Sequence, residues 1–137
     1  MEFDTAISTC FRKFARFRGR ARRSEYWIFN IFGLFCFFVA YIVDLMMGTT
    51  LTDEDGAFAG GLFFWLTFLV LALPLISVAV RRLHDSGSSG WWYWIQLIPF
   101  AGPLLFLIWM CTPGTDGSND YGPDPLDPEA ETAAVFE

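Results

Sequence analysis

Three stretches of about twenty residues are almost entirely apolar, and every basic residue lies outside them. The stretches are 26–47, 61–80 and 91–111, and each is long enough as a helix to cross the hydrocarbon core of a bilayer. A chain of 137 residues that is 54% hydrophobic cannot bury this much apolar surface in a soluble domain. The sequence therefore predicts an all-α integral membrane protein with three transmembrane helices, in a single membrane domain over 1–111.

The N-terminal segment has the pattern of an amphipathic helix. Between Phe3 and Phe17 apolar side chains recur every three or four residues, which is the spacing of one helix face. The opposite face carries Asp4, Ser8, Thr9, Arg12, Lys13 and Arg16. A helix over 3–17 can lie at the membrane surface, with phenylalanines in the acyl boundary and cations near anionic head groups. Packing of the same stripe against the transmembrane helices is the alternative.

The basic residues fall in two groups, and we expect both groups to lie in the cytoplasm. Seven of the nine lie within 12–23, and the other two are Arg81 and Arg82, directly after the second apolar stretch. An N-terminus on the inner side places every cation in the cytoplasm, as the positive-inside rule requires. The pattern therefore predicts a multi-pass membrane protein with a cytoplasmic N-terminus.

The segment 112–137 differs from the rest of the chain because it holds seven acidic residues and no basic one. Its Gly, Pro and acid content predicts a disordered acidic tail. Three full crossings place this tail outside the cell. The interruption at Pro99-Phe100-Ala101-Gly102-Pro103 leaves open a re-entrant third segment that returns the tail to the cytoplasm. The length of 91–111 favours the full crossing.

Polar residues gather at the expected cytoplasmic ends of the first two crossings. They are Arg20, Arg22, Arg23, Glu25, Arg81, Arg82, His84 and Asp85. If the second helix continues past residue 80, Arg81, His84 and Asp85 share one face, and Arg81 can pair with Asp85. One interpretation is a structural lock, in which Arg–acid pairs join two helices and His84 bonds a backbone carbonyl. The other is an anion site, since guanidinium groups bind a lipid phosphate with paired donors.

Two further residues, Asp44 and His84, are candidates for chemistry. Asp44 is the acid predicted inside a membrane helix, where it can mark an ion or proton path. Its place about one turn from the outer end also suits bonding to hydroxyl, backbone or water donors. His84 is the single histidine, and its neighbour Asp85 points away from it on a helix. We therefore expect no enzyme activity, no catalytic residue, no metal and no cofactor.

Four short motifs suggest a family. They are Phe17-Arg18-Gly19-Arg20 with Arg23-Ser24-Glu25-Tyr26-Trp27; Arg81-Arg82-Leu83-His84-Asp85 with Gly87, Ser89, Gly90, Trp91 and Trp92; Leu97-Ile98-Pro99 with Gly102; and Gly114, Gly117, Asn119, Tyr121-Gly122-Pro123 and Pro125. Together they resemble a family known as domain of unknown function 805. The resemblance implies a small protein of the bacterial plasma (inner) membrane, and it brings no established reaction, cofactor or catalytic residue.

Three functions remain as alternatives. The preferred one is an inner-membrane protein without catalytic activity that binds anionic phospholipid head groups or membrane protein partners through its Arg/His/Asp cluster. A homo-oligomer is left open, and no nucleic-acid partner is expected. The second is a subunit of an oligomeric transporter or channel that uses Asp44. The third is a membrane enzyme that uses His84.

Overall fold

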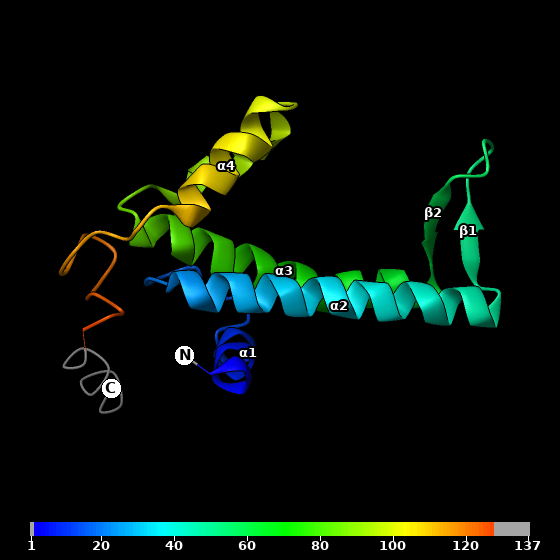
Figure 1. Ribbon diagram of the computed structural model, residues 1–137, viewed down its shortest axis with the longest axis horizontal. Helices are drawn as coiled ribbons and strands as arrows, with labels where there is room; N and C mark the ends of the chain where they lie inside the picture. Colours follow the sequence, from blue (N-terminus) through cyan, green and yellow to red (C-terminus); the bar gives the residue numbers. More distant parts are fainter. Residues whose placement is uncertain (1, 128–137) are drawn as a thin grey trace.

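The computed structural model describes residues 2–127 and is built on two long antiparallel helices, α2 (Arg23–Met47) and α3 (Leu62–Asp85) (Figure 1). At a rise of 1.5 Å per residue, each reaches about 36 Å, more than the roughly 30 Å of a hydrocarbon core. In the described part of the chain, these two helices are long and apolar enough to cross a membrane. We call the end of the pair that carries Arg23 and Asp85 the arginine end.

The two helices meet along an apolar interface and expose apolar side chains on their outer faces. Phe29 of α2 and Leu71, Val78 and Leu83 of α3 are buried in the core. Gly33 of α2 faces Leu75 of α3, where an added Cβ would make ordinary contact at 3.4 Å. Large exposed side chains cover the outward faces, among them Leu34, Phe35, Phe38, Leu69 and Val70. Such faces suit lipid rather than water as their surroundings.

Helix α1 (Phe3–Arg12) lies across the pair on the side away from α4 in Figure 1. It is shorter than the predicted helix over 3–17. The carbonyls of Lys13 and Arg16 accept hydrogen bonds from Ser77 of α3, at 3.2 and 2.8 Å, so the chain after α1 is drawn onto α3. The ring of Phe11 packs edge-on against Phe29, with centroids 5.6 Å apart. Part of the apolar stripe therefore packs on the protein itself.

The loop between α2 and α3 forms a small antiparallel β-hairpin that the all-α prediction missed. Strand β1 (Thr50–Thr52) pairs with β2 (Phe58–Gly61) at the end of the helix pair opposite the arginine end (Figure 1). The Asp53 carboxylate accepts the amides of Asp55 and Ala57 at 3.1 and 2.7 Å. This local bonding closes the turn between the strands.

The third apolar stretch is not the continuous helix predicted for 91–111. It forms a 3₁₀ helix, η1 (Gly90–Leu97), and a short α-helix, α4 (Ala101–Cys111). Pro99 lacks an amide donor, and Phe100 has a positive φ of 63°, so the helix cannot run through this point. The two pieces fold back on one another as a helical hairpin, with both ends at the arginine end (Figure 1).

The C-terminal segment, residues 112–127, also lies at the arginine end. The predicted disordered tail is wrong for this part, because the segment forms specific hydrogen bonds to Arg20, Arg22 and Arg82. These contacts hold the segment beside the arginines, at the same end of α2 and α3. Residues 128–137 lie outside the described part of the chain.

Candidate functional site

The arginine end holds three buried guanidinium groups, those of Arg20, Arg81 and Arg82. Their residues are 7%, 1% and 0% exposed. Helix α3 continues to Asp85, which carries Arg81, Arg82 and His84 into the protein rather than leaving them on a surface loop. We use the name arginine cluster for the following residues: Arg20, Glu25, Arg81, Arg82, His84 and Asp85. A buried charge is costly unless it is paired, so the partners of each group decide what the cluster does.

Arg81 pairs with Glu25 in the first turn of α2. Its Nη1 lies 2.6 Å from the Glu25 Oε1, and both side chains are buried. The predicted pair between Arg81 and Asp85 is therefore wrong. The reason is tertiary: Arg81 faces α2, while Asp85 is held by two other arginines. The Cys10 thiol adds a weak hydrogen bond to Glu25 at 3.6 Å, and burial, with Glu25 adding to the effect, raises the pKa of that thiol to about 12.

Asp85 lies between Arg20 and Arg82. Its Oδ1 is 2.8 Å from Arg20 Nε, and its Oδ2 is 2.5 Å from Arg82 Nη1. The backbone amide of Ala21 donates to the Arg81 carbonyl at 3.1 Å, which fixes the N-terminal segment beside α3. Gly114 must be a glycine here, because a Cβ would lie 2.3 Å from Asp85 Oδ2.

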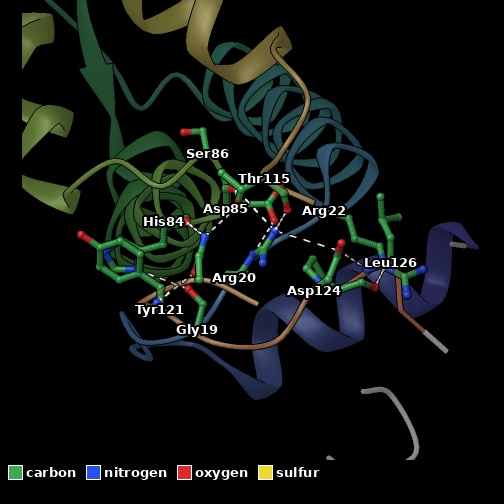
Figure 2. Close-up of polar contacts among 12 residues, drawn as sticks. Gly19, Arg20, Arg22, His84, Asp85, Ser86, Thr115, Tyr121, Asp124 and Leu126 are labelled. Atoms are coloured by element: carbon green, nitrogen blue, oxygen red, sulfur yellow. Dashed lines mark hydrogen bonds and ion pairs between the residues drawn. The ribbon is translucent and has the colours of Figure 1, made fainter. Parts of the chain in front are cut away.

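The C-terminal segment covers the cluster with backbone carbonyls. Figure 2 shows Arg20 between Asp85 of α3 and residues Thr115 and Asp124 of the segment. Arg20 donates to the carbonyls of Gly117 and Thr115 at 2.5 and 2.6 Å. Arg82 donates to the Thr112 carbonyl, and Arg22 to the Pro125 carbonyl. The Thr115 amide in turn donates to the Asp85 carbonyl at 2.8 Å. Arg23 lies at the rim, exposed, 3.3 Å from the Cys111 carbonyl.

Asp124 brings a third carboxylate to the three buried arginines. Its Oδ1 lies 4.0 Å from Arg20 Nη2. The Leu126 amide, followed by the Gly117 amide and the charges of Arg20 and Arg22, holds the pKa of Asp124 below its usual range. Three nitrogens, Nε and Nη2 of Arg81 and Nε of Arg82, are buried without a hydrogen-bond partner in the described part of the chain. The other guanidinium nitrogens of the three buried arginines bond to carboxylates or backbone carbonyls, and the carboxylates balance the charge.

His84 has a structural set of contacts. Its Nδ1 lies 3.3 Å from the Gly19 carbonyl, so the ring donates to that oxygen when Nδ1 carries the proton. The Tyr121 ring stacks on the imidazole at 4.0 Å and 3° (Figure 2). Asn119 donates to the His84 carbonyl at 2.9 Å. Asp85, the neighbouring carboxylate, is held by Arg20 and Arg82, so the partners of the imidazole in the described part of the chain are a carbonyl and a phenol ring.

Asp44 lies apart from the cluster, beside the β-hairpin, and is fully buried. Its Oδ1 accepts the Thr49 hydroxyl at 2.5 Å and the Phe63 amide at 3.0 Å, and its Oδ2 accepts the Phe64 amide at 2.8 Å. These amides are in the first turn of α3, so an acid from α2 satisfies the start of the next helix. This bonding accounts for the buried carboxylate without an ion path.

Four residues of the C-terminal segment lie over the arginine cluster and were not identified as site residues from the sequence. They are Thr115, Asn119, Tyr121 and Asp124. Asn119 and Tyr121 lie in the fourth motif of the family resemblance, which was the available signal. Residues of the first, second and fourth motifs lie at the arginine cluster, whereas the third motif, with Pro99 and Gly102, forms the turn of the adjoining helical hairpin.

Comparison with known proteins shows which family the chain matches. The family described as "Protein of unknown function (DUF805)" matches residues 14–123. Inner membrane protein YhaH of Escherichia coli strain K12 is 39% identical over 114 residues, which cover 83% of this chain and 90% of the relative. Inner membrane protein YhaI of the same strain is 38% identical, covering 83% and 89%. Uncharacterized protein YiiR is 28% identical, covering 81% and 86%. No solved structure matches the chain.

Proposed function

The chain belongs to the family of unknown function DUF805, and we propose that it is a non-enzymatic protein whose cytoplasmic surface binds anionic phospholipid head groups. Its curated relatives are bacterial inner-membrane proteins, and neither the family description nor these names indicate an enzymatic activity. A protein of this location meets anionic head groups at its inner surface, where basic side chains bind them.

The division of the basic residues supports this proposal. Arg20, Arg81 and Arg82 are buried and engaged by internal partners, so they are poorly placed to bind lipid. Arg12, Arg16, Arg18 and Arg23 are exposed around α1 and the start of α2. We call these four the basic surface. The proposed lipid contact is thus the basic surface and not the buried cluster, which has the role of a structural lock.

Exposed aromatic side chains accompany the basic surface. Phe3, Phe11 and Phe17 on the same N-terminal segment are 55%, 37% and 40% exposed. Phenylalanine in the acyl boundary beside arginine at the head groups is the arrangement of an interfacial helix. Each basic side chain near an anionic surface contributes about 1 kcal/mol at moderate salt, so the four together supply several kcal/mol.

Charge also supports a cytoplasmic arginine end. The nine basic residues of the chain lie there, in the N-terminal segment and at the end of α3. The turn of the β-hairpin at the other end carries Asp53, Glu54 and Asp55. The positive-inside rule then orients α2 outward and α3 inward.

The test compares lipid composition in reconstituted nanodiscs. We expect the thermal stability of the wild-type protein to rise when phosphatidylglycerol replaces part of the phosphatidylcholine, and this gain to shrink at high salt. The triple variant Arg12→Gln, Arg16→Gln, Arg18→Gln is expected to lose most of the gain. The matched control Arg12→Lys, Arg16→Lys, Arg18→Lys keeps the charge and is expected to retain it.

Native mass spectrometry of lipids that remain bound provides a second measurement. Enrichment of phosphatidylglycerol on the wild type and on the lysine control, with loss on the glutamine variant, is the expected result. The proposal is wrong if the glutamine variant keeps the full phosphatidylglycerol-dependent stability, or if the wild type prefers neither lipid.

A further inference from the structure

We propose that η1 and α4 form a re-entrant hairpin that inserts into the inner leaflet without crossing the membrane, so that the C-terminal segment lies on the same side as the N-terminus. The partner of this surface is the acyl region of one leaflet. The assignment of that leaflet to the cytoplasmic side rests on the orientation in the proposed function. The insertion itself rests on independent contacts.

Both ends of the helical hairpin are tied to the arginine end. A linker of four residues joins the end of α3 at Asp85 to the start of η1 at Gly90, and the Ser89 side chain accepts the Trp91 amide at 3.4 Å. The chain leaves α4 beside the cluster, where Arg23 donates to the Cys111 carbonyl and Arg82 to the Thr112 carbonyl. The entry and the exit of this apolar stretch are therefore at the same end of α2 and α3 (Figure 1).

The ring contacts show how the two limbs are paired. Trp92 of η1 and Trp109 of α4 lie with ring centroids 5.3 Å apart. One step deeper, the ring of Tyr93 meets Phe106 at 5.8 Å. Each pair is placed almost symmetrically about residue 100, which is the tip of the hairpin. Tryptophans at both limbs of the base match an aromatic belt at a single membrane interface.

The dimensions fit one leaflet. The 11 residues of α4 reach about 16 Å as an α-helix, close to half of the roughly 30 Å hydrocarbon core. No charged residue occurs between Gly90 and Cys111. Phe100 at the tip is 93% exposed, and Leu97 and Leu104 beside it are also strongly exposed. An apolar tip of this kind needs acyl chains as its surroundings.

The limbs are held together closely enough to keep the turn closed. A Cβ on Gly102 would lie 1.9 Å from the Ile95 carbonyl oxygen, so only glycine permits the observed approach. The Gly102 amide donates to the Ile98 carbonyl at 3.0 Å, and the Ala101 amide to the Pro99 carbonyl at 2.8 Å. These bonds satisfy two amides of the turn, which lowers the cost of placing it in lipid.

The first experiment measures the side of the membrane by labelling. In a background with Cys10, Cys36 and Cys111 replaced by alanine, single cysteines are introduced as Ser8→Cys, Glu54→Cys and Ser118→Cys, all at exposed positions. Intact spheroplasts are treated with an impermeant maleimide. We expect Glu54→Cys to be labelled at once, and Ser8→Cys and Ser118→Cys only after lysis.

The outcomes separate the hairpin from the orientation. Labelling of Ser118→Cys together with Glu54→Cys, with Ser8→Cys protected, means that the third stretch crosses the membrane and overturns the proposal. Labelling of Ser8→Cys and Ser118→Cys, with Glu54→Cys protected, reverses the orientation in the proposed function but supports the re-entrant hairpin.

A depth measurement separates insertion from a hairpin that rests on the membrane surface. Nitroxide labels at Phe100→Cys, Trp92→Cys and Trp109→Cys are compared in nanodiscs for collisions with oxygen and with a water-soluble nickel chelate. We expect the label at 100 to lie near the bilayer centre and the labels at 92 and 109 at equal, interfacial depth. Strong collision of the label at 100 with the nickel chelate overturns the proposal.

Discussion

Breaking the buried pair between Glu25 and Arg81 from one side should be among the most destabilising single substitutions in the protein. The residues are 3% and 1% exposed, and their charged atoms are 2.6 Å apart. Glu25→Gln removes the counter-charge and leaves a guanidinium buried, with two of its nitrogens already without partners. Breaking a buried pair in this way costs about 3–5 kcal/mol. We therefore expect the unfolding equilibrium to shift by at least about 100-fold.

Removing both charges should have a much smaller effect. In Glu25→Leu with Arg81→Met, neither partner leaves a buried charge, and the apolar side chains can pack against the existing core. Such replacements are often neutral or stabilising, so the double variant should lie within about 1 kcal/mol of the wild type. The exchange Arg81→Asp with Asp85→Arg should not recover stability, because these two residues do not pair with each other.

The assay measures the free energy of unfolding in a titration of the protein, held in mild detergent, with sodium dodecyl sulfate. Tryptophan fluorescence monitors the unfolding. Cys10→Ala is the control for the weaker contact to Glu25. The reasoning would be refuted if Glu25→Gln lost less than about 1 kcal/mol, below the range for broken buried pairs. It would also be refuted if the losses of the single variants Glu25→Leu and Arg81→Met added up in the double variant, because additivity indicates independent sites.

Three further outcomes follow from named contacts. Asp44→Asn should cost about 1–2 kcal/mol in the same titration, because one amide oxygen cannot replace two carboxylate oxygens at a helix start; unchanged stability would contradict this. Gly114→Ala should detach the C-terminal segment, since its Cβ meets Asp85, and faster proteolysis of that segment than in Ser118→Ala measures it. The Leu126 amide holds the pKa of Asp124 below its usual range. The ionised Asp124 therefore stabilises docking of the C-terminal segment above its unfolded pKa. This stabilisation is lost only as the pH falls through the lower pKa of the docked state. A fluorophore on the segment should therefore report docking unchanged from pH 7 to 5 and release only below about pH 4; release between pH 7 and 5 would contradict it.

The sequence predicted the two long helices because hydrophobicity and charge are local properties. Apolar runs over 26–47 and 61–80 correspond to α2 and α3, although both helices extend further toward the arginine end. The predicted continuous helix over 91–111 is wrong because Pro99 interrupts it, which the length and hydrophobicity of the stretch do not show. The turn depends on the approach of Gly102 to the Ile95 carbonyl, a tertiary contact that length and composition do not reveal.

The membership of the arginine cluster was also readable from the sequence, whereas its pairing was not. The helix periodicity suggested Arg81 with Asp85, but the fold presents Glu25 to Arg81 and Arg20 to Asp85. Both partners, Glu25 and Arg20, lie far from α3 in the sequence, so local periodicity cannot predict them. The composition of the tail indicated disorder, yet backbone carbonyls within 112–127 accept hydrogen bonds from buried guanidinium groups. An acidic, Gly- and Pro-rich sequence does not distinguish a free tail from one that is held by arginines.

The distance between the N-terminal and C-terminal segments tests the central claim most directly. Arg20 bonds the Gly117 carbonyl at 2.5 Å, so the Cα atoms of residues 18 and 118 should be at most about 20 Å apart. Nitroxides at Arg18→Cys and Ser118→Cys, measured by double electron–electron resonance in nanodiscs, should give one short, narrow distribution. A distribution centred beyond the roughly 30 Å hydrocarbon core would place the segments on opposite sides of the membrane and contradict the account.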